Sequence, residues 1–165
     1  MFSVGDKVVH PMHGAGIIDR IVTETVAGAA QDYYVFRMPV GGLVLKIPTA
    51  AGDASGLRGV WDPVRAMQLM KDLASLEVEN FTGSWNQRYR ENMQKLKSGD
   101  LYEVARVMKS LVRRDKEKNL STGERKMLRT AKQILISEVV LSTGEDYREI
   151  EQQVHSAIAG GEESV

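Results

Sequence analysis

The sequence contains no cysteine, and aromatic residues make up only 6% of its 165 residues. Without cysteine, the chain has neither disulfides nor thiolate ligands for a structural zinc site. It also lacks an apolar run that approaches the roughly 20 residues needed to cross a bilayer. The opening MFSVGDKVVH does not match a secretory signal peptide, because no apolar stretch follows a charged start. These absences are compatible with a cytoplasmic protein, and we expect no interaction with membranes.

Motifs for catalysis and cofactor binding are missing as well. The sequence has no phosphate-binding G-x-x-x-x-G-K-[ST] loop and no G-x-S-x-G nucleophile elbow. Gly14-Ala15-Gly16 is not a dinucleotide fingerprint, because no third glycine follows. His10 and His13 could share a metal ion, but no third ligand is evident. We therefore expect a non-enzymatic protein with no catalytic residue, metal, cofactor or small-molecule substrate. An enzyme would need a cleft with converging ionisable groups.

Positive charge is concentrated in one stretch, although the whole chain is neutral with 22 basic and 22 acidic residues. Residues 1–80 have a net charge of −2, residues 81–132 have +8, and residues 133–165 have −6. A polyanion would be attracted to the middle stretch and repelled by the last one. The alternative is that these charges only cover solvated helix faces.

The hydrophobic pattern changes near residue 60. Before it, β-branched segments separated by glycine and proline predict strands at residues 7–10, 17–26, 33–38 and 43–47. After it, apolar residues recur at helical spacing. The predicted fold class is α+β. It comprises a small twisted sheet or SH3-like barrel in residues 1–58, a compact all-α domain in residues 59–160 and a flexible acidic tail in residues 161–165.

Capping residues predict where the helices begin. Five helices are expected to start next to Asp62, Ser84, Asp100, Ser121 and Ser142. The pairs Ser84 with Gln87 and Ser121 with Glu124 each match a capping box. Ser142 with Glu145 predicts that the fifth helix is short.

The segment SWNQRYRENMQKLKSGD, residues 84–100, allows two interpretations. Trp85 lies in the first turn of a predicted helix beside Arg88 and Arg90, an arrangement suited to contact bases and phosphates together. The other interpretation is a core stripe, because apolar side chains recur there at helical spacing. That stripe would consist of Trp85, Tyr89, Met93 and Leu96.

Several motifs together resemble a known family. The opening VGDKVVHPMHGAGII and the later LKIP, residues 45–48, resemble the start of CarD/CdnL-type bacterial transcription regulators. The same opening is similar to the polymerase-interacting domain of transcription-repair coupling factors. SWNQRYRENMQKLKSGD, the RRD of residues 113–115 and LSTGERKML of residues 120–128 resemble the helical half of CarD. The resemblance covers roughly residues 2–142, and the two halves in this order exclude the much larger repair translocase.

The resemblance implies a Tudor-like β module that binds the β subunit of bacterial RNA polymerase. It also implies a helical domain that contacts promoter DNA at the upstream edge of the bubble. Trp85 matches the family's minor-groove wedge, and Arg88, Arg90 and Arg125 match basic positions near it. Lys126 is a weaker DNA-binding candidate, and the implied polymerase-binding residues are Lys46, Glu24 and Val26. Two positions depart from the family: members often carry a basic residue at the position of Gln87, and some carry arginine at the position of Glu24.

The function expected from these features is a non-enzymatic transcription factor that docks on polymerase and stabilises the open promoter complex. It would be cytoplasmic and associated with the nucleoid through the polymerase. Two alternatives remain. In one, the chain is a protein–protein adaptor whose helices are only a scaffold, and in the other it binds DNA on its own.

Overall fold

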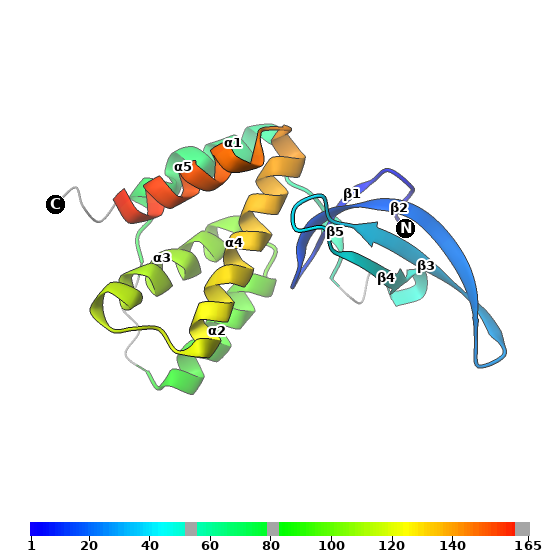
Figure 1. Cartoon of the computed structure of the whole chain (residues 1–165), viewed down its shortest axis with the longest axis horizontal. Coiled ribbons are helices and arrows are strands. Elements are labelled where there is room, and N and C mark those ends of the chain that lie inside the picture. Colours follow the sequence, from blue (N-terminus) through cyan, green and yellow to red (C-terminus); the bar gives the residue numbers. More distant parts are fainter. Residues whose placement is uncertain (52–55, 79–82, 161–165) are drawn as a thin grey trace.

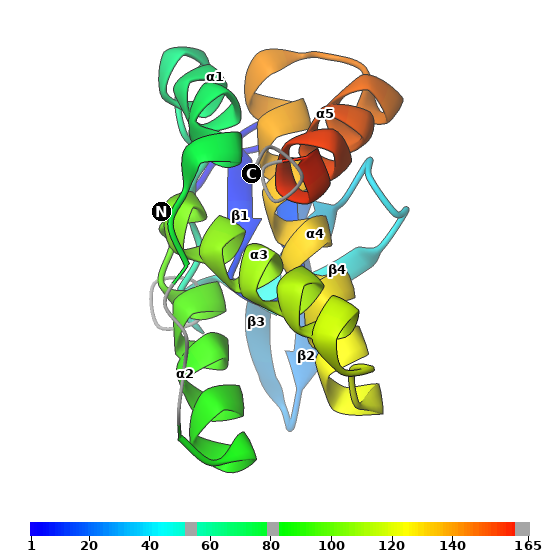
Figure 2. The ribbon, with the colours of Figure 1, turned by 90° about the vertical axis from the view of Figure 1, so that its left-hand side faces the viewer.

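The computed structural model describes residues 1–51, 56–78 and 83–160, and within these ranges it contains one sheet and five α-helices. The helices lie together on one side of the sheet, with helix α4 (Thr122–Thr143) nearest to it (Figures 1 and 2). The predicted α+β class, a β module followed by helices, is confirmed. The predicted acidic tail, residues 161–165, lies outside the described residues.

The β module is an antiparallel sheet with the strand order β4-β3-β2-β1-β5. The strands are β1 (Lys7–His10), β2 (Gly14–Val26), β3 (Ala29–Arg37), β4 (Val44–Pro48) and β5 (Arg58–Gly59). A 3₁₀ turn, Thr49–Ala51, follows β4. Because β5 pairs with β1, the sheet extends one residue past the expected domain boundary at residue 58.

Strands β2 and β3 form a hairpin that projects away from the helices (Figure 1). Both strands start earlier than the sequence predicts, by three and four residues. β2 starts earlier because Gly14 and Gly16, which read as turn residues in the sequence, are buried and pair with His10 and Val8 of β1. β3 starts earlier because its first residues lie in the largely exposed outer half of the hairpin and show no clean alternation of apolar and polar side chains. The tight turn at Ala27-Gly28 has positive φ angles of 53° and 81°, as two-residue hairpins require.

A small core holds the inner half of the sheet together. It consists of Val8, Ile18, Tyr34, Phe36, Met38, Ile47 and Leu57. Gly16 is needed beside this core, because a Cβ there would lie 2.6 Å from the ring of Phe36. Such a small set of buried side chains gives limited stability by itself, so the module depends on its contacts with the helices.

The helical part starts where the caps predict for four of its five helices. The elements are α1 (Pro63–Asp72), a 3₁₀ turn (Leu73–Ser75), α2 (Trp85–Lys97), α3 (Leu101–Glu117), α4 and α5 (Tyr147–Gly160). The side chains of Asp62, Ser84, Asp100 and Ser121 accept hydrogen bonds from backbone N–H groups in the first turns of α1 to α4. All five helices contribute to a core that includes Leu69, Leu96, Met108, Leu135 and Ile150.

The predicted start of the fifth helix at Ser142 is wrong. Helix α4 continues to Thr143 and ends at Gly144, which has the left-handed conformation of a helix C-cap, and α5 begins only at Tyr147. The Ser142 hydroxyl donates instead to the Trp61 carbonyl at 2.5 Å. α5 has 14 residues and is therefore not short.

Helix α4 joins the two parts of the molecule through hydrogen bonds to the sheet. The Ala15 N–H donates to Ser137 Oγ at 2.9 Å, and Lys7 Nζ donates to the Leu141 carbonyl at 3.0 Å. Gln133 Nε2 donates to the Val40 carbonyl at 2.8 Å. Gly14 has a φ of 106°, and a Cβ there would lie 2.4 Å from Ser137 Oγ, so a side chain would push the sheet away from the helix.

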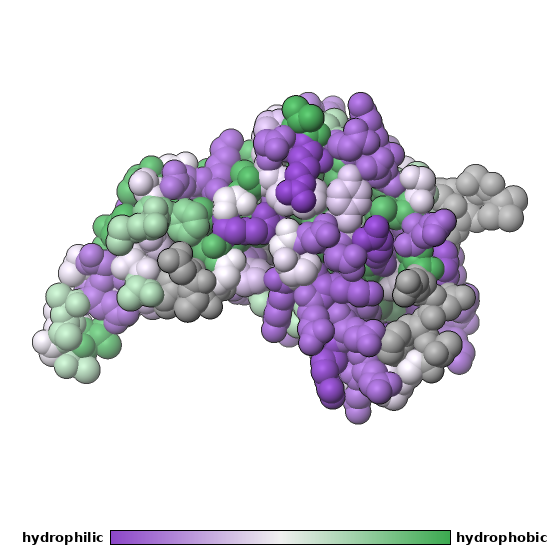
Figure 3. Space-filling view, turned by 180° about the vertical axis from the view of Figure 1, so that it is seen from behind, coloured by the Kyte–Doolittle hydropathy of each residue, from purple (hydrophilic) through white to green (hydrophobic). Residues whose placement is uncertain are grey.

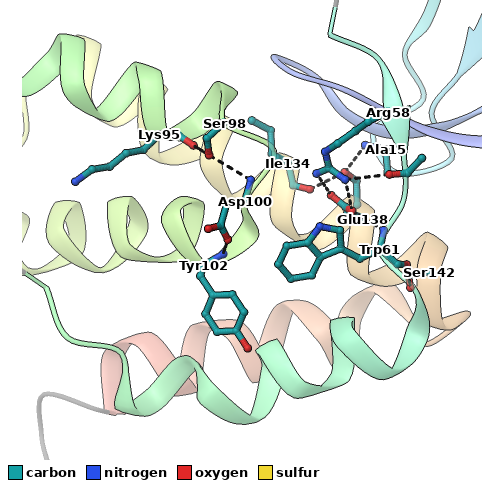
Figure 4. A network of polar contacts seen from close by, with 12 residues as sticks. Ala15, Arg58, Trp61, Lys95, Ser98, Asp100, Tyr102, Ile134, Glu138 and Ser142 are labelled. Atoms are coloured by element: carbon teal, nitrogen blue, oxygen red, sulfur yellow. Dashed lines mark hydrogen bonds and ion pairs between the residues drawn. The ribbon is translucent and has the colours of Figure 1, made fainter.

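Glu138 is the central polar residue of this junction (Figure 4). It is fully buried, and its two carboxylate oxygens accept from both terminal nitrogens of Arg58 at 2.8 and 2.6 Å. One of these oxygens also accepts from the Trp61 N–H at 2.8 Å. The guanidinium of Arg65 covers the Trp61 ring at 3.6 Å from the ring centroid. One carboxylate therefore joins the last strand, the linker into α1 and the C-terminal third of α4.

We predict that Arg58→Ala lowers the free energy of unfolding by about 3–5 kcal/mol, because it leaves the buried Glu138 carboxylate without its counterion. Urea titration followed by circular dichroism measures this loss. The exposed Arg148 provides the matched control, and Arg148→Ala should change stability by less than about 0.5 kcal/mol.

The double variant Arg58→Met/Glu138→Leu should recover much of this stability, because it removes both charges together. Equal losses from Arg58→Ala and Arg148→Ala would contradict the assigned role of the Arg58–Glu138 pair.

Candidate nucleic-acid interface

Three helix ends meet at the point of the molecule where the sequence predicts DNA contacts. The start of α2, the end of α3 and the start of α4 lie together, which places residues 84–90, Arg114 and residues 121–126 side by side. We call this set the helical tip. It lies at the end of the helical part away from α1 and α5 (Figure 1), and hydrophilic residues dominate that end in Figure 3.

Trp85 is partly exposed on the helical tip. Its exposed fraction is 43%, and its indole stacks on the Tyr89 ring with centroids 5.1 Å apart and an interplanar angle of 19°. Tyr89 and Met93 pack against the helical core, and Leu96 is buried in it. The apolar stripe of α2 therefore enters the core from Tyr89 onward, while Trp85 faces outward at its start.

The two helix starts bring partial positive charge to the same place. Ser84 Oγ accepts from the Gln87 N–H at 3.2 Å, and Ser121 Oγ accepts from the Glu124 N–H at 3.2 Å. Each cap satisfies one of the four N–H groups that a helix start leaves without a helical partner. The remaining N–H dipoles attract anions within about one turn. Gln87 Oε1 also accepts from the Ser84 N–H at 3.3 Å, so its side chain completes the cap.

Arg88 is held inside the molecule, unlike the other basic residues predicted to bind DNA. Its Nε lies 3.4 Å from an oxygen of Glu124, and its side chain is only 14% exposed. Arg114 Nε from α3 lies 3.4 Å from the same oxygen, and the Glu124 side chain is 5% exposed. Arg88 therefore joins α2 to α4 through Glu124, and this internal contact limits its reach toward a phosphate.

Arg90, Arg125 and Lys126 are exposed on the helical tip. Arg125 Nε donates to the Leu120 carbonyl at 3.2 Å. The two terminal nitrogens of the guanidinium do not take part in this hydrogen bond. Trp85 and Arg90 belong to α2 and Arg125 and Lys126 to the adjacent first turn of α4, so the helical tip carries one partly exposed aromatic ring and three exposed cations. Such a surface can contact the sugar-phosphate backbone and a base step at once. The DNA-binding role of each residue stays a prediction.

The residues predicted to bind polymerase lie on the β module, away from the helical tip. Lys46 on the edge strand β4 forms an ion pair with Glu24 on β2, and both side chains are about half exposed. Val26, near the end of the projecting hairpin, is 45% exposed. Apolar residues gather at the end of the hairpin in Figure 3. The three residues thus belong to one exposed surface, and their polymerase-binding role stays a prediction.

The two neighbouring histidines do not form the centre of a larger ligand cluster. The rings of His10 and His13 are 4.6 Å apart, and His10 Nδ1 accepts from the Met12 N–H at 3.1 Å. Burial, together with the neighbouring His13, lowers the pKa of His10 below its usual value. Within residues 1–51, 56–78 and 83–160, no group of three or more metal-ligating side chains occurs. No helix in the same ranges is long and apolar enough to cross a membrane.

Sequence reasoning missed three residues of the helical tip: Tyr89 as a stacking partner, Gly123 beside the indole and Glu124 as an anchor. Ser121-x-x-Glu124 is visible in the sequence as a capping box, but that pattern does not indicate which residues of other helices Glu124 contacts. Gly123 is a poor helix former in the first turn of a predicted helix. That residue choice is the one sequence signal that another side chain packs closely against the backbone there.

We predict that Arg88→Ala and Arg90→Ala differ in stability, although the two residues look alike in the sequence. Arg88→Ala should lower the free energy of unfolding by about 2 kcal/mol, because it weakens a mostly buried ion pair that Arg114 only partly replaces. Arg90→Ala should change it by less than about 0.5 kcal/mol, as for an exposed side chain. Urea unfolding of both variants at moderate salt measures the difference, and equal losses would contradict the internal role of Arg88.

Two family models match the chain and together cover most of it. The CarD-like/TRCF RID domain matches residues 2–60, and the domain described as "CarD, C-terminal domain" matches residues 68–155. Among curated proteins, the chain is similar to the "Putative transcription factor YdeB" of Bacillus subtilis (strain 168). The two sequences are 39% identical over 144 residues, which is 87% of this chain and 94% of that protein.

Proposed function

This chain belongs to the CarD family of transcription regulators, and we propose that it binds the β subunit of RNA polymerase and stabilises the open promoter complex. The β module docks on the polymerase, and the helical tip contacts promoter DNA at the upstream edge of the bubble. The observation that carries this proposal is Trp85, which is 43% exposed between two helix starts. Tryptophan contributes strongly to binding when a partner buries it.

The proposed mechanism is a wedge that favours the open state. Inserting an apolar side chain between stacked base pairs costs a few kcal/mol in closed duplex. At the edge of a bubble the bases are already unstacked, so Trp85 binds there without that cost. A ligand shifts an equilibrium only by its difference in affinity for the two states. Trp85 therefore stabilises the open complex over the closed one.

The basic residues of the helical tip hold the duplex beside the wedge. We assign phosphate contacts to the exposed Arg90 and Arg125, with Lys126 as a weaker contact. Arg88 contributes mainly by fixing α2 to α4 through Glu124. Few phosphate contacts give weak affinity for free DNA, since affinity grows with the number of phosphates that are neutralised.

Docking on polymerase supplies the missing affinity. The exposed edge strand β4, with Lys46 on it and with Glu24 and Val26 nearby, offers both backbone pairing and side-chain contacts to a partner strand. Once docked, the helical tip meets promoter DNA at an effective concentration of about 1 mM. The protein would then act in the cytoplasm and reach the nucleoid through the polymerase.

Trp85→Ala should leave polymerase binding unchanged and shorten the lifetime of the open complex. The lifetime is measured on a weak promoter after challenge with a competitor DNA. Loss of the exposed, stacked indole should cost about 1 kcal/mol of stability, compared with about 3–5 kcal/mol for a core tryptophan. Trp85→Phe keeps a smaller apolar ring and should give an intermediate lifetime. A Trp85→Ala protein that prolongs the open complex like wild type would favour the adaptor function.

Lys46→Glu should weaken binding to the polymerase β subunit without changing binding to free DNA. The substitution alone also places two acidic side chains together, so the control is the exchange Lys46→Glu/Glu24→Lys, which restores an ion pair with reversed direction. If polymerase recognises the positive charge at position 46, both variants bind weakly in a titration. Wild-type affinity in both would show that this surface is not the docking site.

A further inference from the structure

Trp85 is supported by two residues, Tyr89 and Gly123, to which neither the sequence analysis nor the proposed function assigns a role in DNA contact. The indole and the Tyr89 ring lie one helical turn apart on α2 and are nearly parallel, at 19°. Stacked aromatic pairs at this centroid separation attract each other beyond the area they bury. Tyr89 also packs against the helical core. The Tyr89 ring therefore connects an exposed side chain to the rigid interior.

The first turn of α4 restricts the position of the Trp85 indole from a second direction. A Cβ on Gly123 would lie 3.6 Å from the Trp85 Cζ2 atom and 3.8 Å from the Tyr89 Cε2 atom. The backbone of α4 therefore lies beside both rings, with room at position 123 for a methyl group in ordinary contact but not for a branched side chain. The next residue, Glu124, is paired with Arg88 of α2, so the two helices cannot easily separate and release the rings.

These contacts leave one face of the indole accessible. Tyr89 stacks on the opposite face, and Gly123 lies beside the Cζ2 and Cη2 atoms of the six-membered ring, so a base would stack on the 43%-exposed Trp85 from the remaining face. A free exposed tryptophan would lose rotational freedom when it binds, and a ring held in place before binding avoids that loss.

We propose that Tyr89 and Gly123 are positioning residues that hold Trp85 as a wedge with a single stacking face, ready to contact an unpaired base. The inference rests on the proposed function, because it concerns how the same tip recognises the bubble edge. It predicts a continuous stack of Tyr89, Trp85 and one base. In the purely structural alternative, Tyr89 only fills space at the rim of the core, and its effects on activity follow its effects on stability.

Two pairs of variants separate these alternatives. Tyr89→Phe keeps the aromatic ring that stacks on the indole, so it should retain full activity. Tyr89→Leu keeps apolar volume but removes the stacking surface. Gly123→Ala adds a methyl group at ordinary contact distance and strengthens the helix. Gly123→Ile adds two branches at Cβ, and at least one must enter the space of the rings.

Each variant is measured as the full chain for thermal melting, polymerase affinity, near-UV circular dichroism and open-complex lifetime. The near-UV signal of the ring pair is obtained by subtracting the spectrum of Trp85→Phe. Tyr89→Phe and Gly123→Ala should match wild type in lifetime, and Gly123→Ala should melt at the same or a higher temperature. Tyr89→Leu and Gly123→Ile should lose the ring-pair signal and shorten the lifetime by about threefold, the equivalent of one aromatic pair, with unchanged polymerase affinity.

The outcomes distinguish failure of this inference from failure of the proposed function. If Trp85→Ala shortens the lifetime but Gly123→Ile loses the ring-pair signal and keeps the wild-type lifetime, the positioning role is wrong and the wedge remains. If Trp85→Ala has no effect, the wedge itself is wrong and the positioning role is overturned with it. If Tyr89→Leu melts far below wild type, Gly123→Ile decides alone, because its site is in a first helical turn outside the core.

Discussion

The buried carboxylate of Glu138 is the constraint on which the arrangement of this molecule depends. A charge with no exposed surface is unfavourable unless its partners are placed correctly. Glu138 requires the guanidinium of Arg58 from the last strand and the N–H of Trp61 from the linker into α1. Both partners can be present only when the sheet lies against α4 in one orientation. The pair adds little net stability over apolar packing, but it selects that orientation strongly, because any slip leaves an unpaired buried charge.

The proposed mechanism needs such an orientation, since a wedge works only if it reaches the right base step. Helix α4 contacts the β module and the helical tip with different parts of its length. Its C-terminal half contacts the β module and the linker that follows it through Gln133, Ser137 and Glu138. Its first turn lies against Trp85 at Gly123. Helix α4 is continuous between them, and a continuous helix transmits position with little bending. A docked β module would therefore determine which base step the helical tip meets. If the connection were flexible, the position of the tip along the DNA would vary, and its effective concentration at any one base step would be lower.

Local signals predicted most of the fold, and contacts between distant segments account for the errors. Capping residues located four helix starts because a cap is a local contact, and the strands followed from β-branched segments between turns. Ser142 was misread because the same cap-like spacing occurs inside a helix, where its hydroxyl bonds to Trp61 instead. Arg88 and Arg90 could not be told apart from sequence, since only the packing of α2 on α4 decides which of them meets Glu124. Glu138 carries no sequence pattern that sets it apart from the other acidic residues of 133–165, since its partners Arg58 and Trp61 lie far away in the chain.

The same internal pairing changes what the charge distribution means. The net charge of +8 in residues 81–132 overstates the field that DNA would meet, because Arg88 and Arg114 are partly neutralised by Glu124 within the fold. What remains at the tip is a small group of exposed cations, two helix starts and one supported ring. Strong positive charge would bind any duplex and hold the protein away from polymerase. A weakly charged tip with an ordered aromatic face has the opposite property, since it gains little from closed duplex and most from a site where a base is already unstacked. In the proposed mechanism, selectivity for the open promoter then follows from the modest charge of the tip together with the proposed fixed position of Trp85.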